Sequence, residues 1–264
     1  MYRLNERQWS EMEKTLEPHS KGSQGKVYKA KLLRMDVAVK RYNNPEEFVK
    51  ELICLNNCTS EYIVSVCGMT PTADAIFLDW YPSDLENYVL TNSPRVPESV
   101  QLMKDLCHAV QYVHRVGYIH LDIRPKNVLV KMGHCVLCDF GLAIRDQEPY
   151  DHTRGVDTWV APEIVFGRVV STKTDVYSLG LVIWFTLESQ GSAPFIATTT
   201  VPMIKAAMQT KERPRWNFSN KGPYLDVCKQ IADVTKKCWA EEQEKRPAAA
   251  VVAAKFDDWV KEVK

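Results

Sequence analysis

The sequence lacks a strong excess of charge of either sign. Its 34 Lys and Arg residues are balanced by 33 Asp and Glu residues, which leaves a formal net charge of +1. A chain with so small a charge has no long-range field that would attract a nucleic acid or an anionic membrane surface. We therefore expect no nucleic acid among the partners of this protein.

Long apolar runs are also missing. The most apolar stretch, residues 177–187, is too short to span a bilayer and is typical of a buried helix. Residues 1–17 are polar and contain several Glu, so they do not resemble a secretory signal peptide. The sequence thus predicts no membrane insertion and a soluble protein inside the cell, in the cytoplasm or alternatively in the nucleus.

Cysteine is present, but not in a pattern that indicates disulfides or a metal. The eight Cys are scattered along the chain. Cys135 and Cys138 form the closest pair, and the two residues between them are typical of a strand rather than of a zinc knuckle. We therefore expect buried free thiols in a reducing compartment.

Internal repeats and low-complexity tracts are absent, and the chain divides into two kinds of region. A content of 45% hydrophobic and 25% charged residues is that of a globular protein. Strands show alternating apolar residues, and amphipathic helices show them at three- and four-residue steps. The strand pattern occurs in residues 27–32, 37–40 and 76–78, and the helical pattern in residues 100–113, 231–238 and 251–260.

The composition changes near Asp79-Trp80-Tyr81-Pro82, which we take as the junction between these regions. The sequence therefore predicts an α+β fold in which one domain, residues 1–264, has two lobes. Residues 1–79 are expected to form a small β-rich lobe, residues 80–82 a hinge, and residues 83–264 a larger helical lobe. A cleft is expected between the lobes.

A glycine-containing segment precedes the strand-like run of residues 27–32 and is expected to link it to another strand before it. Ser20, Gly22 and Gly25 lie in this segment, and Gly residues let backbone N–H groups approach phosphate oxygens closely because no Cβ intervenes. The signal is weak by itself, because two Gly at this spacing more often mark an ordinary hairpin. The segment is not a Walker A loop, since no Gly-Lys-Ser/Thr follows at the right distance.

The next strand-like run ends at Lys40, and a helix is expected soon after it. Asn44 is expected as the N-cap, Pro45 in the first turn, and Glu47 at the capping-box position. Glu51 falls on or beside the apolar stripe of this helix, where an unpaired carboxylate would cost several kcal/mol. Lys40 is the natural partner of Glu51. The alternative is that Glu51 lies at the edge of a solvated face.

Three polar residues in the helical region follow one another on loops at strand ends. Asp122 and Asn127 lie in one loop, and Asp139 begins an Asp-Phe-Gly after the next strand-like run. Two carboxylates and a carboxamide suit in-line phosphoryl transfer: Asp139 can hold Mg²⁺, Asn127 a second Mg²⁺, and Asp122 can accept the proton of a substrate hydroxyl. Each short motif alone is common, and an isolated Asp-Phe-Gly is often an ordinary turn.

In order and spacing, these residues together resemble the signature set of eukaryotic-type protein kinases. The resemblance extends to Ala161-Pro162-Glu163, to a segment that begins at Asp175 and resembles the start of the family's central buried helix, and to Arg246, which in this family usually pairs with the Glu of Ala-Pro-Glu, here Glu163. It covers nearly the whole chain, from about residue 20 to residue 260. The resemblance implies a bilobal kinase fold, ATP and Mg²⁺ as cofactors, and a protein substrate.

The resemblance also implies roles for individual residues. Lys40, Asp122, Arg124 and Asn127 would be catalytic, with Arg124 placed to steady the γ-phosphate, and Asn127 and Asp139 would hold the metal. Leu78 would be the gatekeeper, and the backbone of Asp79 and Tyr81 would bind adenine at the hinge. The complete expected nucleotide site is Ser20, Gly22, Gly25, Val27, Ala38, Lys40, Glu51, Leu78, Asp79, Tyr81, Leu129 and Asp139, with Val27, Ala38 and Leu129 around the adenine.

Four positions depart from the family pattern. Ser20 replaces the first Gly of the loop, and His19 stands where an aliphatic residue usually caps adenine; both put nucleotide affinity in question. Leu121 replaces the Arg that usually precedes the catalytic Asp. Val156 stands where Ser/Thr kinases usually carry a Thr.

Three functions fit the sequence to different degrees. An active protein kinase is favoured, because a pure scaffold does not need five polar groups that converge on one cleft. The alternative is a pseudokinase that serves as a scaffold or binding module, and a third option is a small-molecule phosphotransferase. Pro125-Lys126-Asn127 resembles the Ser/Thr pattern, whereas Arg124 and Trp159 resemble tyrosine kinases and the tyrosine-kinase-like Ser/Thr group. We expect Ser/Thr as the acceptor rather than Tyr.

Overall fold

The structure, a computed structural model, describes residues 2–21, 25–151, 157–189, 191–192, 194, 200–210, 213–219 and 221–264. Two positions of interest, Gly22 and Val156, lie outside these residues. The described chain is mixed α and β, with strands concentrated before residue 80 and helices after it, so the expected fold class is confirmed.

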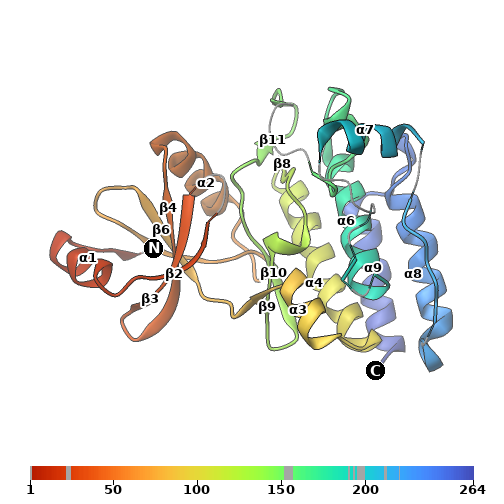
Figure 1. Cartoon of the computed structure of the whole chain (residues 1–264), viewed down its shortest axis with the longest axis horizontal. Coiled ribbons are helices and arrows are strands. Elements are labelled where there is room, and N and C mark those ends of the chain that lie inside the picture. Colours follow the sequence, from red (N-terminus) through yellow and green to blue (C-terminus); the bar gives the residue numbers. More distant parts are fainter. Residues whose placement is uncertain are drawn as a thin grey trace.

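The first part of the chain folds around a six-stranded sheet (Figure 1). The strand order is β1-β5-β6-β4-β3-β2, and every pairing is antiparallel except that of β1 with β5. The strands are β1 (Tyr2–Arg3), β2 (Glu17–Lys21), β3 (Gly25–Leu32), β4 (Met35–Tyr42), β5 (Val66–Met69) and β6 (Ala75–Asp79). The strand-like runs of the sequence correspond to β3, β4 and β6.

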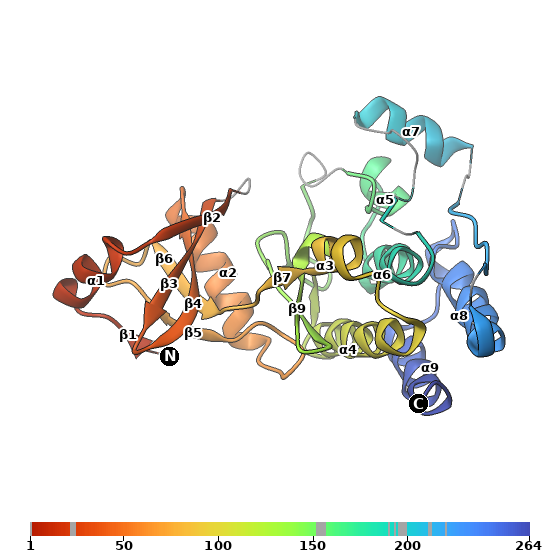
Figure 2. The same ribbon diagram turned by 60° about the horizontal axis from the view of Figure 1, so that its bottom comes forward.

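Two helices cover opposite faces of this sheet (Figures 1 and 2): α1 (Glu6–Glu13) and α2 (Pro45–Asn57). Side chains alternate between the faces along each strand. Val39 and Phe77 pack in the cluster that contains Trp9 of α1, whereas Leu78 packs in the core that contains residues of α2. Lys40, adjacent to Val39, is therefore directed to the α2 side.

Helix α1 was not predicted from the sequence, in which the helix that begins near Asn44 was the one helix expected before residue 80. The helix begins at the N-cap Asn5, whose side chain and that of Gln8 form a capping box. Trp9 and Met12 are its buried residues, and the Trp9 ring lies 6.0 Å from the ring of Phe77. Only two apolar residues face the sheet, so the helical period is too short to stand out in the sequence.

Helix α2 begins as the sequence predicted. Asn44 is the N-cap and Pro45 occupies the first turn. The predicted capping box is not the arrangement observed, because the Asn44 side chain accepts from the backbone N–H of Glu46, at 2.8 Å, rather than from the N–H of Glu47. Glu51 is fully buried, which excludes the alternative of a solvated position.

The second part of the chain is a helical lobe with short strands (Figure 2). The helix predicted over residues 100–113 is α4, which ends before Gly117, a residue with φ of +81°. The segment 177–187 lies in α6, and nearly all of this helix is buried, as predicted. The helices are α3 (Leu85–Asn92), α4 (Val96–Arg115), α5 (Pro162–Val165), α6 (Thr172–Leu187), α7 (Val201–Gln209), α8 (Leu225–Cys238) and α9 (Ala249–Glu262).

Short strands and single helical turns connect these helices and carry the loops of the site. The strands are β7 (Ser83–Asp84), β8 (Tyr118–Ile119), β9 (Val128–Lys131), β10 (His134–Leu137) and β11 (Ile144–Arg145). The turns are η1 (Pro125–Asn127), η2 (Gly222–Tyr224) and η3 (Gln243–Lys245). Strand β9 pairs with β7 and β10, and β8 pairs with β11.

Two expectations about absent features can be compared with this fold. Among the described residues, no helix combines the length and the apolar character needed to cross a membrane. All eight Cys fall within the described ranges and are free thiols, and six of them are buried. The interpretation of the Cys as free thiols is confirmed.

Candidate active site

A cavity of about 420 Å³ lies between the sheet and the helical lobe. Its volume is within the range of small-molecule sites. Every predicted site residue that the structure describes lines this cavity; Gly22 lies outside the described residues. These residues are Ser20, Gly25, Val27, Ala38, Lys40, Glu51, Leu78, Asp79, Tyr81, Asp122, Arg124, Asn127, Leu129 and Asp139.

Lys40 joins two carboxylates at the back of the cavity. Its Nζ lies 2.7 Å from Glu51 Oε2 and 2.8 Å from Asp139 Oδ1. Burial alone would lower the pKa of Lys40, but Glu51 and Asp139 outweigh burial, so this pKa is raised. Burial raises the pKa of Asp139, but Lys40 outweighs that effect and the pKa is lowered. Lys40 is thus held as a cation, and Asp139 as an anion, inside the cavity.

Glu51 is the least accessible member of this group. Burial raises its pKa, and the charge of Lys40 opposes that change. Its two carboxylate oxygens accept hydrogen bonds from the Lys40 ammonium, at 2.9 and 2.7 Å. Because Glu51 belongs to α2 and Lys40 to β4, the pair fixes the helix against the sheet.

The roof of the cavity comes from β2 and β3. Gly25 approaches the neighbouring strand so closely that a Cβ at this position would lie 1.8 Å from the carbonyl oxygen of Arg41, which only Gly avoids. His19 packs edge-on against the ring of Trp80, with the ring centroids 4.8 Å apart. The aliphatic cap found in related sites is therefore replaced by an imidazole supported by an indole.

The segment that connects the lobes forms one wall of the cavity. Leu78 pairs with Ala38 across β6 and β4, which places both beside the cavity. The backbone N–H of Asp79 donates to Ser65 O at 3.1 Å. The backbone group of Asp79 that remains for a ligand is therefore its carbonyl oxygen, which accepts a hydrogen bond from the ligand. Tyr81 also lines this wall of the cavity.

Asp122 and Asn127 form the floor on the helical side. Asn127 Nδ2 donates to Asp122 Oδ2 at 2.7 Å and to Asp122 O at 2.8 Å. Burial raises the pKa of Asp122 to about 7, an effect strengthened by Asp139 and Asp157 and opposed by Arg124 and Asn127. A carboxylate with a pKa near neutrality is suited to accept a proton from a hydroxyl.

The backbone of this loop is held by a buried carboxylate of α6. Asp175 accepts from the N–H groups of His120 and Leu121, each at 2.8 Å, and its Oδ2 lies 2.8 Å from His114 Nε2. These bonds hold Leu121 at φ of +64°, a conformation that costs energy for a residue with a branched side chain. Because Asp122 follows Leu121 in the chain, Asp175 thereby fixes the direction of the Asp122 side chain.

The side chain of Leu121 has apolar surroundings. It is 5% exposed and packs in a cluster with Ile144 of β11, with Val160, and with Ile164 of α5. Tyr150 packs against the same cluster. This cluster joins the loop of Asp122 to the segment that follows Asp139 through apolar contacts.

Arg124 is oriented by a carboxylate from the same segment. Its Nη1 lies 2.5 Å from Asp157 Oδ2, and both side chains are about 70% buried. Asp157 Oδ1 also accepts from the N–H of Trp159 at 2.8 Å. Arg124 therefore faces the cavity while paired, and its partner was not foreseen from the sequence.

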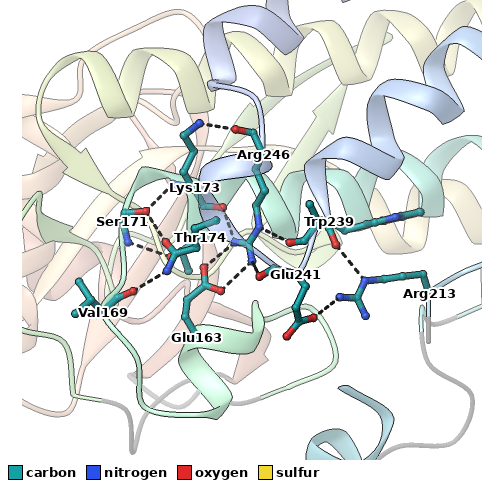
Figure 3. Close-up of polar contacts among 11 residues, drawn as sticks. Glu163, Val169, Ser171, Lys173, Thr174, Arg213, Trp239, Glu241 and Arg246 are labelled. Atoms are coloured by element: carbon teal, nitrogen blue, oxygen red, sulfur yellow. Dashed lines mark hydrogen bonds and ion pairs between the residues drawn. The ribbon is translucent and has the colours of Figure 1, made fainter. Parts of the chain in front are cut away.

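The end of that segment is anchored to the helical lobe by the ion pair of Arg246 with Glu163 (Figure 3). The guanidinium reaches the two carboxylate oxygens at 2.7 and 3.0 Å, so the pairing implied by the resemblance is confirmed. Arg246 also donates to the carbonyl oxygens of Ala240, Lys173 and Glu241. A buried pair with its remaining hydrogen bonds satisfied holds this part of the chain firmly in place.

Comparison with known proteins agrees with this geometry. Residues 13–256 match the family model described as protein tyrosine and serine/threonine kinase. The chain belongs to this family.

Individual relatives of this kinase domain are distant in sequence. The dual specificity protein kinase shkA of Dictyostelium discoideum is 28% identical over 258 residues, which cover 90% of this chain and 47% of the relative. The serine/threonine/tyrosine-protein kinase HT1 of Arabidopsis thaliana is 26% identical, with coverage of 91% and 65%. Mitogen-activated protein kinase kinase kinase 7 of Homo sapiens is 26% identical, with coverage of 86% and 38%. The chain thus spans less than two thirds of the length of each of these relatives.

The oxygen ligands in the kinase cavity fit the Mg²⁺ that the family implies. Asn127 donates to Asp122 through Nδ2, so its side-chain oxygen Oδ1 can face a cation. Asp139 accepts from Lys40 through Oδ1 and is also held by the backbone of Gly141, and the remaining lone pairs of its carboxylate can face a cation. Carboxylate and amide oxygens are the hard ligands that Mg²⁺ prefers, and phosphate and water usually complete its shell.

Several residues that line the kinase cavity were not predicted. Trp80 lies in the predicted hinge but was given no role, and Asp84 is the N-cap of α3. Lys126 lies 3.2 Å from Glu86. The unpredicted lining residues are His19, Trp80, Ser83, Asp84, Lys126 and Cys138. His19 was noted from the sequence only as a departure, and the motif neighbours Lys126 and Cys138 could have been included because they flank predicted residues.

Proposed function

We propose that this domain is an active protein kinase that transfers the γ-phosphate of Mg·ATP to a Ser or Thr hydroxyl of a protein substrate. The observation that carries the proposal is the convergence of Lys40, Glu51 and Asp139 with Asp122 and Asn127 around one cavity. A pseudokinase that only binds partners does not need this arrangement of buried charge.

The roles of the residues follow from their positions. Lys40, held by Glu51, points its ammonium into the cavity, where it stabilises the charge of the nucleotide phosphates. Mg²⁺ bound at Asp139 and Asn127 would neutralise charge on the transferred phosphoryl group. Arg124 lies at the same floor of the cavity as Asp122 and adds positive charge near the reacting centre.

Asp122 acts on the acceptor. The Asn127 amide holds its Oδ2 at 2.7 Å, and Oδ1 is the oxygen that accepts the proton of the substrate hydroxyl. The pKa of about 7 lets Asp122 be deprotonated before the reaction and still hold a proton transiently after it. The backbone bonds from Asp175 keep this geometry fixed.

The choice of Ser/Thr rests on the loop Pro125-Lys126-Asn127, which has the pattern of Ser/Thr kinases. One relative is named a dual specificity protein kinase and another a serine/threonine/tyrosine-protein kinase, so Tyr is the competing acceptor. The comparison supports a kinase of this broad group.

A matched peptide assay tests the proposal. Three peptide libraries that differ only in the acceptor, Ser, Thr or Tyr, are incubated with the domain and Mg·[γ-³²P]ATP. We expect incorporation into Ser and Thr peptides at least tenfold above Tyr peptides. Equal or greater incorporation into Tyr peptides would contradict the acceptor assignment but leave the kinase assignment intact.

The pseudokinase alternative has a different signature in the same assay. A pseudokinase would label no library even when it binds Mg·ATP, so wild type and the Asp122→Asn variant would give the same background. Incorporation that disappears in Asp122→Asn, with the melting temperature retained, supports the enzyme.

A further inference from the structure

Tyr42 lies at the end of β4, at the junction between the sheet and α2. It follows Lys40 by two residues, so its side chain is on the same face of the strand. Its backbone N–H donates to Asp74 O at 2.9 Å, and only Asn43 and Asn44 separate it from the first residue of α2. The position of Tyr42 therefore decides where α2 begins relative to Lys40.

The ring of Tyr42 contacts both the helix and the ammonium. It packs edge-on against Phe48 of α2, with a centroid distance of 5.6 Å and an interplanar angle of 82°. Lys40 Nζ lies 5.3 Å from the Tyr42 ring centroid. An aromatic face at this distance stabilises a cation, and the edge-on pair is a favourable packing geometry.

The hydroxyl of Tyr42 is buried beside the pair of Lys40 and Glu51, because its ring contacts the same ammonium that Glu51 binds. It does not form a hydrogen bond of full geometry within the described residues, yet it is close enough for Glu51 to affect it. Burial, followed by the charge of Glu51, raises the pKa of Tyr42, so the hydroxyl stays protonated and can act only as a neutral donor toward that carboxylate.

The charges at this site explain why a second donor matters. The single ammonium of Lys40 is shared between Glu51 and Asp139. Glu51 is fully buried and receives no help from bulk water. When Lys40 donates a hydrogen bond to a nucleotide phosphate, Glu51 must remain in place to hold the Lys40 ammonium. A neighbouring hydroxyl is the group that can support the carboxylate at that moment.

We propose that Tyr42 is a positioning residue for phosphoryl transfer: its hydroxyl orients Glu51, and its ring seats α2, so that Lys40 stays directed into the cavity. The proposal rests on the proposed kinase function. Tyr42 does not line the cavity, and it acts through Glu51 and Lys40.

Two substitutions separate the hydroxyl from the ring. Tyr42→Phe keeps the packing against Phe48 and removes only the donor, whereas Tyr42→Leu removes both. We expect Tyr42→Phe to lower kcat/KM for ATP roughly tenfold, because Glu51 loses the donor that would support it when Lys40 binds phosphate, with the melting temperature within ~2 °C of wild type. We expect Tyr42→Leu to lower both activity and melting temperature.

A matched control is provided by Tyr88. Its hydroxyl also donates to a carboxylate, that of Glu98, but it lies in the helical lobe and does not line the cavity. Tyr88→Phe is the same chemical change, and kcat/KM for ATP should stay within twofold of wild type.

A double-mutant cycle with Glu51→Gln decides whether Tyr42 acts through Glu51. If it does, Tyr42→Phe should change kcat/KM by no more than about twofold when Glu51 is already Gln. Additive losses in the double variant, or a Tyr42→Phe enzyme within twofold of wild type, would overturn the proposal.

A binding measurement keeps this test apart from that of the proposed function. Binding of Mg·ATP, whose Kd is measured by calorimetry, requires Lys40 to contact the nucleotide phosphates but does not require phosphoryl transfer. We expect Tyr42→Phe to weaken binding severalfold, and we expect no further weakening in the Glu51→Gln background. If the wild type transfers no phosphate but this pattern holds, the function is wrong and the role of Tyr42 stands; a Kd unchanged by Tyr42→Phe would reject the role of Tyr42 alone.

Discussion

Lys40 Nζ lies 2.7 Å from Glu51 Oε2, and this one contact joins the sheet to α2 at the back of the cavity. The same ammonium lies 2.8 Å from Asp139, 99 residues later in the chain. Three elements that are distant in sequence are thus held together by one cation. Loss of that cation should affect the chemistry far more than the fold.

Lys40→Met should reduce phosphoryl transfer by roughly 10²–10³-fold or more, because one preorganised electrostatic group is lost. The methionine keeps an unbranched apolar chain of similar length, so the sheet should remain folded. Steady-state kinetics with circular dichroism measure the two effects. Lys31→Met, on the exposed side of the neighbouring strand, is the matched control and should retain wild-type turnover. Near-normal turnover of Lys40→Met would remove Lys40 from the site.

Asp139→Asn should nearly abolish turnover, because it takes a charge from the predicted Mg²⁺ site. The wall formed by Leu78, Asp79 and Tyr81 is not altered by this change. An ATP-competitive ligand that binds this wall should therefore retain its affinity within a few-fold, as measured by calorimetry. Intact catalysis in Asp139→Asn would mean that the metal is held by other residues.

The pKa of Asp122 predicts the acid side of the pH–rate profile. Since the pKa of about 7 is that of the proposed base, kcat/KM should fall as the pH drops through 7, by about tenfold per unit well below it. Asp157→Asn removes a negative charge that raises this pKa and releases Arg124, whose charge lowers it. Both changes have the same sign, so the acid limb should move to lower pH. An acid limb that moves to higher pH or stays in place would contradict the role of Asp122 as base.

The raised pKa of Asp122 also has a consequence for stability. Between the ordinary carboxyl pKa and about 7, the folded protein binds more protons at this position than the unfolded chain does, so this group makes folding less favourable as the pH rises through that window. Asp122→Asn removes the buried charge. It should therefore melt at the same or a higher temperature than wild type above pH 7, while lacking activity.

The polar residues of the site could be predicted because they lie in short sequence motifs. Lys40, Asp122 and Asp139 each lie in a short segment whose residue types and order are characteristic, and the buried stripe of α2 made Glu51 identifiable. Asp157 and Tyr42 could not be predicted in the same way. Their roles depend on which side chains the folded chain brings beside them, Arg124 in one case and Glu51 in the other.

Helix α1 shows the same limit at the level of the fold. Arg41 of β4 pairs with Glu13 of α1 at 2.8 Å and stacks on Trp9 at 5.6 Å. These contacts, together with the burial of Trp9 and Met12, stabilise a helix of eight residues that local propensity alone would leave marginal. The sequence signal was weak because the stabilising partners lie in the sheet.

Leu121 leads to a prediction about regulation by phosphorylation of the activation segment. An Arg at this position commonly contributes to a basic pocket that a phosphate on the activation segment neutralises, whereas Leu cannot donate to phosphate. The Leu121 side chain instead packs with Ile144 and Val160, which joins the segment to the catalytic loop without a phosphate. Activity should therefore not require phosphorylation of this segment.

Phosphatase treatment, or Tyr150→Phe combined with Thr153→Ala, measures that independence. Thr153 lies outside the described residues, and Thr158 is left unchanged because it directly follows Asp157, the partner of Arg124, so that a change there could act on the site itself. Turnover should change by no more than a few-fold. A hundredfold drop after dephosphorylation, with unchanged binding of a hinge ligand, would show that another cation takes the place of the missing Arg.

Above all, Asp122 is proposed to serve phosphoryl transfer in this cavity. The most direct test is the transfer of ³²P from Mg·[γ-³²P]ATP to a mixed Ser, Thr and Tyr peptide library by wild type and by Asp122→Asn at equal folded concentration. We predict clear labelling by wild type and a loss of at least 10²-fold in Asp122→Asn, with Mg·ATP still bound. Equal labelling by the two proteins, or none by either while Mg·ATP binds, would contradict this role of Asp122.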